Sequence, residues 1–199
     1  MSAPLILASR SAARRMVLEG AGVPFEAEDA GVDEGAVKDR LLAGGSTPLD
    51  VAVALAGEKA LVVSARRPGR LVLGSDQTLD FQGRLIDKAP DMEAARARLV
   101  ELRGKTHALR NGTALALDGA VVWSGAASAI LHTRDFSDAF LDAYLAAEGD
   151  ALLGSVGCYR LEGLGAQLFE RVEGDYFTIL GLPLWPLLDE LRARGVIAS

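Results

Sequence analysis

The sequence predicts a mixed α/β fold, and two observations support this expectation. Short apolar runs typical of strands, such as Leu5 to Ser9 and Leu71 to Ser75, alternate with segments whose apolar residues recur at helical spacing. Asp118-Gly119 separates two long apolar segments, His107 to Leu117 and Ala120 to Leu131, in the pattern of a β-hairpin. We therefore expect buried strands, an antiparallel hairpin and covering helices.

The N-terminal elements follow from turn residues and apolar spacing. Ser11 is a good N-cap for a helix that follows the first strand, and glycines end that helix. A short strand at Pro24 to Ala27 is expected next, followed by an acidic loop with Asp33 and Glu34 and a mobile glycine-rich segment around Gly44-Gly45. A helix from Pro48 to about Ala65 then places Val51, Leu55 and Val62 on one apolar stripe.

In the rest of the chain, the apolar run before Asp76 predicts a central strand that delivers this carboxylate to its carboxyl end. Three helices and one strand region complete the expectation: a helix from Asp91 to Arg103 capped by Asp91, a helix from about Ser137 to Ala147, a glycine-rich strand region from Gly154 to Val172, and a last helix from Pro183 to Arg194. No internal repeat or linker interrupts them, so we expect one domain over residues 1–199.

Charge and composition exclude several classes of function. The chain has 21 basic and 27 acidic residues, and a net charge of −6 argues against a nucleic-acid polymer as partner. No apolar stretch reaches membrane-spanning length, and Pro4 already opens a strand-like run, which leaves no room for a signal peptide. Cys158 is the only cysteine and has the apolar neighbours of a buried free thiol. We expect a soluble cytoplasmic protein.

Two local features are candidates for anion binding and catalysis. Arg14 and Arg15 lie in the first turn of a helix, where cations are unfavourable without an anion, and Ser9 adds a hydroxyl donor, so this turn is a candidate phosphate cradle. A solvated basic turn is the alternative. Asp76 lies at the predicted end of a strand, where ligands gather in α/β folds, although an aspartate at an exposed turn is equally common.

The other charged candidates carry weaker local signals. Lys59 lies in register with the buried stripe of its helix, so it either has a buried partner or extends its ammonium to the surface. Lys88, Glu34 and Glu162 have the local character of ordinary solvated residues. Two histidines and one distant cysteine make no zinc cluster, so carboxylates such as Glu34 and Asp76 would instead suit Mg²⁺ or Mn²⁺.

Five motifs, in order and at characteristic spacing, give the chain an end-to-end resemblance to the Maf family of nucleoside triphosphate pyrophosphatases. These motifs are LILASRSAARR from Leu5, VDE at Val32 to Glu34, LAGEKA at Leu55 to Ala60, LGSDQT from Leu73 with Lys88 following, and LEGLGAQLFERVEGDY from Leu161 leading into LGLPL at Leu180 to Leu184.

The resemblance implies a mixed, elongated β-sheet flanked by helices, with two lobes and a central cleft, as in inosine triphosphate pyrophosphatases. It implies that the protein removes non-canonical nucleotides by cutting a nucleoside triphosphate to the monophosphate and pyrophosphate. Asp76 matches the catalytic acidic residue, and Glu34 would help Asp76 to hold a divalent cation, Mg²⁺ or Mn²⁺. The positions that match substrate-binding residues are Ser9, Arg14, Arg15, Lys59, Gln77, Lys88 and Glu162.

Within the family, Gln77 after Asp76 and Glu162 before Gly163 resemble the 7-methyl-GTP pyrophosphatases rather than the dTTP/UTP pyrophosphatases. A carboxylate at position 162 suits a cationic 7-methylated guanine, which also presents N–H donors. Two segments depart from this subfamily. Ser11-Ala12-Ala13 stands where Ser-Pro-Trp is common, and Asp87-Lys88-Ala89 stands where Gly-Lys-Pro is usual.

Three further possibilities follow from the resemblance or compete with it. Members of the family often form homodimers, so a homodimer is a possible assembly. A nucleotide-binding regulator of cell division without turnover is one alternative function, but the retained acidic and cationic residues favour an enzyme. A phosphatase that releases inorganic phosphate stepwise is another, and product analysis separates it from a pyrophosphatase.

Overall fold

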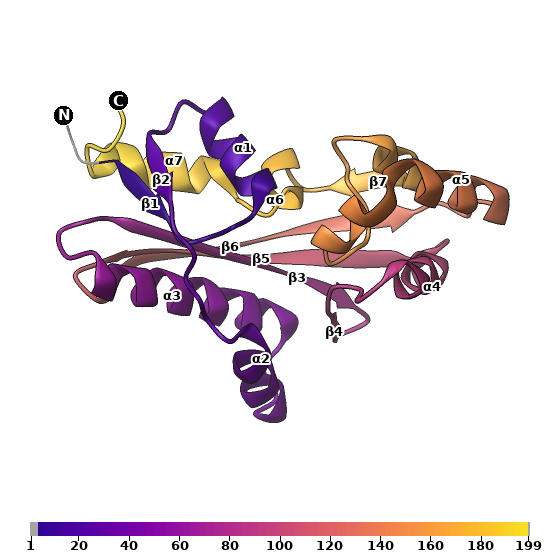
Figure 1. Cartoon of the computed structure of the whole chain (residues 1–199), viewed down its shortest axis with the longest axis horizontal. Coiled ribbons are helices and arrows are strands. Elements are labelled where there is room, and N and C mark those ends of the chain that lie inside the picture. Colours follow the sequence, from indigo (N-terminus) through magenta and orange to yellow (C-terminus); the bar gives the residue numbers. More distant parts are fainter. Residues whose placement is uncertain (1–3, 199) are drawn as a thin grey trace.

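Among the residues that the structure describes, seven strands form one mixed sheet that runs the length of the molecule (Figure 1). The computed structural model describes residues 4–198. Within these residues the strand order is β2-β1-β3-β5-β6-β7, with β4 paired to β3 alone; β1 is parallel to β2 and β3, and the other pairs are antiparallel. The strands are β1 (Leu5–Leu7), β2 (Phe25–Ala27), β3 (Val72–Phe81), β4 (Arg84–Ile86), β5 (Thr106–Leu117), β6 (Ala120–Thr133) and β7 (Phe169–Glu173).

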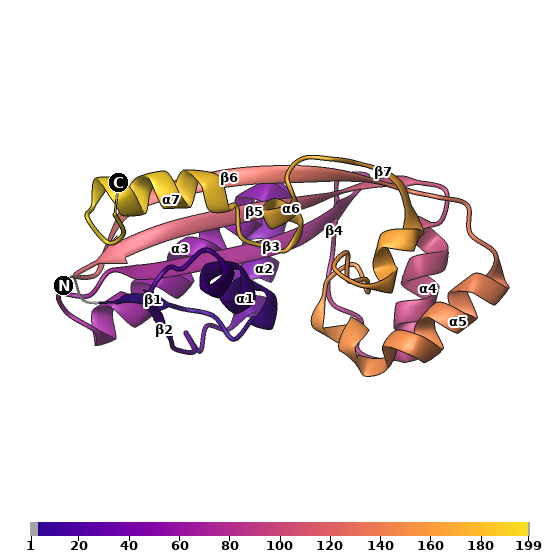
Figure 2. The ribbon, with the colours of Figure 1, turned by 90° about the horizontal axis from the view of Figure 1, so that it is seen from above.

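Helices cover both faces of this sheet and gather into two lobes. Figures 1 and 2 show α1 and α7 near the two termini, α3 on the opposite face, and α4 and α5 at the far end of the long strands. The helices are α1 (Ala12–Gly20), α2 (Glu34–Ala43), α3 (Pro48–Arg66), α4 (Met92–Leu102), α5 (Asp138–Glu148), α6 (Tyr176–Ile179) and α7 (Leu184–Ala193), with two 3-10 helices, η1 (Gly149–Gly154) and η2 (Leu164–Leu168). The structure thus has the two lobes and the mixed sheet that the sequence predicts.

The alternation of side chains along the strands decides which helix packs on which face. Leu7 and Leu73 pack in the apolar cluster with residues of α1 and α7, whereas Ile6 and Val72 pack with Ala56 and other residues of α3. Successive residues of a strand point to opposite faces, so both faces of the central strands are buried. A separate apolar cluster around Phe136 forms the core of the other lobe.

Helix α3 lies unusually close to the sheet because two glycines face it. A Cβ atom on Gly74 of β3 would come within 2.1 Å of the Ala56 carbonyl oxygen, and a Cβ atom on Gly112 of β5 would come within 2.3 Å of the Ala52 carbonyl oxygen. Neither position accepts a side chain without moving the helix. The close approach brings the side chains of α3 within reach of the middle of β3.

Most predicted turns and caps are confirmed. Ser11, Asp91 and Ser137 each accept a hydrogen bond from the backbone three residues later, as N-caps of α1, α4 and α5. Asp118 and Gly119 both have positive φ, 50° and 77°, which is the conformation of a two-residue hairpin turn. The hairpin and the helix that begins at Pro48 are formed by the residues predicted from the sequence.

Other expectations about elements were wrong, each for a physical reason. Asp76 lies within β3 rather than at its end, because β5 pairs with β3 as far as Asp80. Asp33 caps α2, a helix where we expected an acidic loop, whereas Gly44 and Gly45 lie in the turn after this helix. Val62 is 41% exposed, so the buried stripe of α3 continues from Leu55 through Lys59 instead. The region 154–172 forms mainly 3-10 turns and contributes only the short strand β7.

Within residues 4–198, no helix combines the length and the apolar character that crossing a lipid bilayer requires.

Candidate active site

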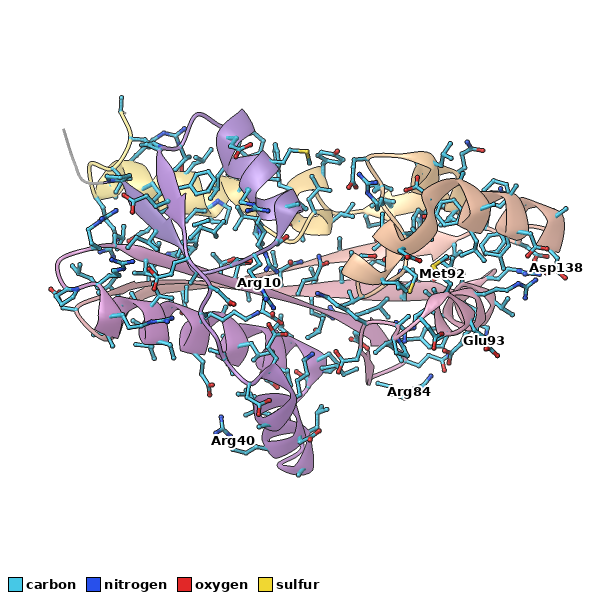
Figure 3. All side chains as sticks on the ribbon, viewed as in Figure 1. Arg10, Arg40, Arg84, Met92, Glu93 and Asp138 are labelled. Atoms are coloured by element: carbon cyan, nitrogen blue, oxygen red, sulfur yellow. The ribbon has the colours of Figure 1, made fainter. Side chains whose placement is uncertain are left out.

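A cavity of about 1070 Å³ lies between the two lobes. Its lining comes from the β1–α1 turn, from residues 29–34, 59, 76–77, 87–88 and 179–181, and, on the opposite wall, from residues 151, 154–157 and 159–162. Figure 3 shows Arg10, a cavity residue of the β1–α1 turn, near the middle of the molecule, with Met92 and Glu93 of α4 in the other lobe. The volume is that of a pocket for a ligand of nucleotide size.

Three charged side chains meet in the cavity. The Lys59 ammonium lies 2.6 Å from Glu34 Oε1 and 2.6 Å from Asp76 Oδ1, so it bridges the two carboxylates. The side chains of Lys59 and Asp76 are only 10% and 8% exposed. Charges that are removed from water to this extent need partners, and each has one here. Of the two alternatives that the sequence left open for Lys59, the structure shows the one with a partner, and this partner is a pair of carboxylates.

The alternation along β3 explains why Asp76 meets Lys59. Gly74 and Asp76 are two residues apart and face the same side of the sheet, toward α3. Lys59 lies one helical turn after Leu55 on the buried stripe of α3. Gly112 is the partner of Asp76 on β5 and also allows α3 to approach. The glycines and the charged pair thus belong to the same packing arrangement.

Residues on the other face of β3 fix the β1–α1 turn. Arg14 is 9% exposed; its Nε donates to the Gly181 carbonyl (2.8 Å) and its Nη1 to Ser9 Oγ (3.1 Å). The Ser75 hydroxyl donates to the same Gly181 carbonyl at 3.0 Å. Burial lowers the pKa of Arg14, while the negative charges of Asp76 and Glu34 act in the opposite direction. Arg14 therefore lies in the field of both carboxylates of the cavity.

Gln77 joins the cavity to the C-terminal end of α6. Its amide nitrogen donates to the carbonyls of Thr178 and Ile179, both at 3.1 Å, and to Asn111 Oδ1 at 3.3 Å. Asn111 is fully buried and donates to the Thr178 carbonyl as well. These bonds use the amide donors of Gln77, so its role in the structure is to hold the C-terminal wall of the cavity.

Lysines surround Glu34. Partial burial would raise the pKa of Glu34, but Lys59, Lys38 and Lys88 together lower it below its ordinary value. The Lys38 ammonium lies 4.0 Å from Glu34 and 2.5 Å from Asp87, which is next to Lys88 in the chain. Glu34 is therefore held in its ionised form at neutral pH.

Glu162 lies in the opposite wall and is paired with an arginine. Arg160 Nε lies 3.2 Å from Glu162 Oε1, and Arg160 Nη1 lies 3.5 Å from Glu148 Oε2. Tyr159, beside them, also lines the cavity, and its hydroxyl lies 2.7 Å from His107 Nε2. The wall that contains Glu162 thus presents carboxylates and an arginine together.

The structure gathers all but one of the predicted site residues around this cavity. Arg15 is exposed and does not line the cavity, because it follows Arg14 on α1 and projects from another side of the helix. The residues in the cavity wall are Ser9, Arg14, Glu34, Lys59, Asp76, Gln77, Lys88 and Glu162.

Sequence reasoning missed Lys38, Arg160 and the Gly181 carbonyl. Lys38 is four residues after Glu34, which is a usable signal for a shared helix face, but α2 itself was not predicted. Arg160 is two residues before Glu162 and faces it only because residues 158–163 form tight turns. No local signal marks Gly181, because its contribution is a backbone oxygen.

The donor set fits a divalent cation that is shared with a substrate. Within residues 4–198, no three His, Cys, Asp or Glu side chains lie close enough together to form a metal site by themselves. Glu34 and Asp76 provide two carboxylates that face the same ammonium. Mg²⁺ is commonly bound by one or two carboxylates together with substrate phosphates. The residues fit that arrangement.

Sequence comparisons with known proteins show one family. The sequence profile of the Maf-like proteins matches residues 4–194. A nucleoside triphosphate pyrophosphatase of Caulobacter vibrioides is 58% identical over 98% of this chain and 97% of its own length. A 7-methyl-GTP pyrophosphatase of Brucella abortus is 47% identical over 99% of each chain. A HAM1 protein from Coxiella burnetii superimposes with a TM-score of 0.42 and 13% identity, covering 68% of this chain and 75% of that one.

Proposed function

The chain belongs to the Maf family, and on this premise we propose that it is a nucleoside triphosphate pyrophosphatase that acts in the cavity between the lobes. The observation that supports this proposal most strongly is the group formed by Glu34, Lys59 and Asp76, with 2.6 Å between the ammonium and each carboxylate. Positive side chains line the same cavity. A polyanion and its attacking water need both kinds of charge.

The proposed reaction is attack of water on the α-phosphorus, with pyrophosphate as the leaving group. Asp76 orients the water and accepts its proton, because it is the buried carboxylate on the floor of the cavity. Arg14, Lys59 and Lys88 neutralise the charge that grows on the departing pyrophosphate. Ser9 and Gln77 line the same cavity, where they complete the walls around the substrate.

Arg15 has a less direct role in the proposal than Arg14. Its backbone lies in the first turn of α1, whose positive end faces the cavity through Arg14, but its side chain is exposed. We propose that Arg15 contributes to the long-range attraction of the triphosphate rather than to a direct contact.

Glu34 and Asp76 would hold the divalent cation, Mg²⁺ or Mn²⁺, together with the phosphates of the substrate. When bound, the cation would neutralise phosphate charge and help to activate the water. The Lys59 ammonium pairs with both carboxylates in the structure described here, so we expect metal affinity to depend strongly on nucleotide. Titration of the protein with Mn²⁺, with and without a non-hydrolysable nucleotide, measures this coupling.

We further propose 7-methyl-GTP as the favoured substrate, with Glu162 as the residue that recognises the base. Glu162 lies in the wall opposite Lys59 and Asp76, where a base would lie if the phosphates face the cations. A carboxylate accepts hydrogen bonds from guanine N–H groups and attracts a cationic ring. Arg160 pairs with Glu162 at 3.2 Å, so the base would have to compete with that arginine.

A panel of nucleoside triphosphates tests the reaction and the substrate. The protein is incubated with Mg²⁺ or Mn²⁺ and with 7-methyl-GTP, GTP, dTTP or UTP, and monophosphate, pyrophosphate and phosphate are quantified. We expect pyrophosphate and monophosphate in equal amounts, with the highest kcat/KM for 7-methyl-GTP. Glu162→Gln should reduce the preference for 7-methyl-GTP over GTP about tenfold. Stepwise phosphate release would refute the reaction class, and preference for dTTP and UTP would refute only the substrate.

A further inference from the structure

Residues 87–91 connect β4 to α4, and Lys88 of this segment lies in the cavity wall. Ala89 is buried in the apolar cluster around Phe136, whereas Asp87 and Lys88 are exposed, so packing against that core does not fix the side chains of Asp87 and Lys88. Figure 1 shows β4 between α2 and α4 along the long axis of the molecule, and each of these helices sends a cation to Asp87.

Lys38 of α2 holds the side chain of Asp87. Its ammonium lies 2.5 Å from Asp87 Oδ1 and 4.0 Å from Glu34 Oε2, and its side chain is only 14% exposed. Lys38 therefore joins the metal-binding carboxylate proposed above to the segment that carries Lys88. An ion pair with one largely buried partner is more strongly ordered than a fully exposed pair.

Arg98 of α4 holds the backbone of Asp87. Its Nη1 donates to the Asp87 carbonyl and also to the Val156 carbonyl, the latter at 2.8 Å. Val156 belongs to the same cavity wall as Glu162. One guanidinium thus fixes the segment of Lys88 relative to the wall that faces the proposed base.

We propose that Asp87 is a positioning residue, which Lys38 and Arg98 hold from two sides so that Lys88 is fixed at the phosphate end of the cavity. The inference rests on the proposed function, because it assigns Lys88 to the triphosphate. The negative charge of Asp87 by itself would repel a triphosphate. By holding Lys88 in place, Asp87 would nevertheless favour its binding.

The sign of the effect of Asp87→Ala separates positioning from simple electrostatics. If Asp87 only contributes its charge, removing that charge weakens repulsion of the triphosphate and frees Lys38 to attract it, so KM falls. If Asp87 positions Lys88, its removal raises KM, because a displaced cation no longer meets the phosphates. The two accounts predict changes of opposite direction.

The experiment is a double-mutant cycle with a matched control pair. Asp87→Ala, Lys38→Met and the double variant are compared with Arg40→Met, Glu58→Ala and their double variant. The control pair also joins α2 to another element by an ion pair, of 2.7 Å, but neither residue lines the cavity. KM and kcat for a nucleoside triphosphate, Kd for its α,β-methylene analogue by calorimetry, and the melting temperature are measured for each variant.

We expect Asp87→Ala to raise KM and the analogue's Kd about tenfold, with a much smaller change in kcat. The KM and Kd of the double variant should be no higher than those of the poorer single variant, because both substitutions break the same ion pair between Lys38 and Asp87. The control variants should change the melting temperature to a similar extent and leave KM and Kd unchanged. A KM or Kd that stays the same or falls in Asp87→Ala, or additive losses in the double variant, would overturn the inference.

Arg98→Met extends the test, with Arg96→Met on the same helix as its control, since Arg96 pairs with Asp142 outside the cavity. Arg98→Met should raise KM, and Arg98→Lys should restore part of the loss. The products of the wild type test the proposed reaction separately. If the wild type releases phosphate stepwise, the proposed function is refuted, but the Kd of the analogue in the variants still tests whether Asp87 positions Lys88. If the analogue does not bind the wild type, both the proposed function and the role of Asp87 are refuted.

Discussion

At the scale of single residues, Lys59 determines the charge balance of the cavity. Glu34 and Asp76 both pair with the Lys59 ammonium, so without Lys59 two carboxylates, of which Asp76 is buried, would lie close together with no cation between them. Burial of a charge is costly unless it is paired, and here one cation satisfies two anions. A substrate that carries a divalent cation would supply further positive charge for these two carboxylates.

Asp76→Asn should lower kcat by at least about 100-fold, because the amide cannot accept a proton from the attacking water. Asp80→Asn is the matched control: Asp80 lies four residues later on β3, accepts from Arg110, and does not line the cavity. The control should retain kcat although it loses an ion pair. Steady-state kinetics with equal concentrations of folded protein measure both, and an active Asp76→Asn variant would refute the assignment of Asp76 as the catalytic base.

His107 makes stability depend on pH. Burial, assisted by the charge of His132, lowers the pKa of His107 to about 4 from an ordinary value of 6.5. Between these values the unfolded chain binds a proton that the folded protein does not, so stability falls as the pH decreases. We expect a loss of about 2 kcal/mol between about pH 7 and about pH 5 through this residue. Urea unfolding of His107→Gln should show a correspondingly smaller dependence on pH; equal slopes for both proteins would contradict the assignment.

Part of the site could be predicted from local sequence, and part could not. Lys59 on a buried stripe indicates that a partner exists, and the two adjacent arginines indicate an anion near α1. The identity of the partners requires the fold, because Glu34 and Asp76 are separated from Lys59 by 25 and 17 positions. Glu34, Lys88 and Glu162 have no local signature, so only the order and spacing of the five motifs identified them.

At the scale of elements, the contact between α3 and the sheet sets the geometry of the site. Gly74→Ala would place a Cβ atom 2.1 Å from the Ala56 carbonyl oxygen, so α3 must move away from β3. We expect a loss of about 1–3 kcal/mol in the free energy of unfolding and a lower kcat, since Lys59 moves away from Asp76. Thermal unfolding and kinetics measure the two effects.

Gly57→Ala is the matched control for that substitution. Gly57 lies on α3 itself, and a Cβ atom there would meet nothing within 4 Å. Alanine should therefore stabilise the helix by about 0.5–1 kcal/mol without changing kcat. If Gly74→Ala were as stable and active as Gly57→Ala, the close packing of α3 would not be what positions Lys59.

Elements with strong local signals were predictable, and those without them were not. The hairpin at Asp118-Gly119 and the capped helices α4 and α5 depend on turn and cap chemistry that the sequence shows directly. Helix α2 was missed because its apolar residues do not form one buried stripe, and Val37 is the buried residue that it contributes. The strand expected over 154–172 failed because its glycines allow tight turns, and the ladder with β6 begins only at Phe169.

At the scale of the whole molecule, the long strands connect two lobes whose apolar cores are separate. The cavity lies between these lobes, so its two walls are supported by different cores and joined through β3, β5 and β6 (Figure 2). The sequence predicted the two lobes only through its resemblance to a family, because no composition change or linker marks a boundary along the chain. The convergence of the five motifs on one cavity follows from this topology.

The central claim is that water attacks the α-phosphorus of a nucleoside triphosphate in this cavity. Hydrolysis in water enriched in oxygen-18, with mass spectrometry of both products, tests it most directly. We predict one labelled oxygen in the nucleoside monophosphate and none in the pyrophosphate, with both products formed at least about 100-fold more slowly by Asp76→Asn. Label in the pyrophosphate, or labelled inorganic phosphate as the first product, would contradict the account.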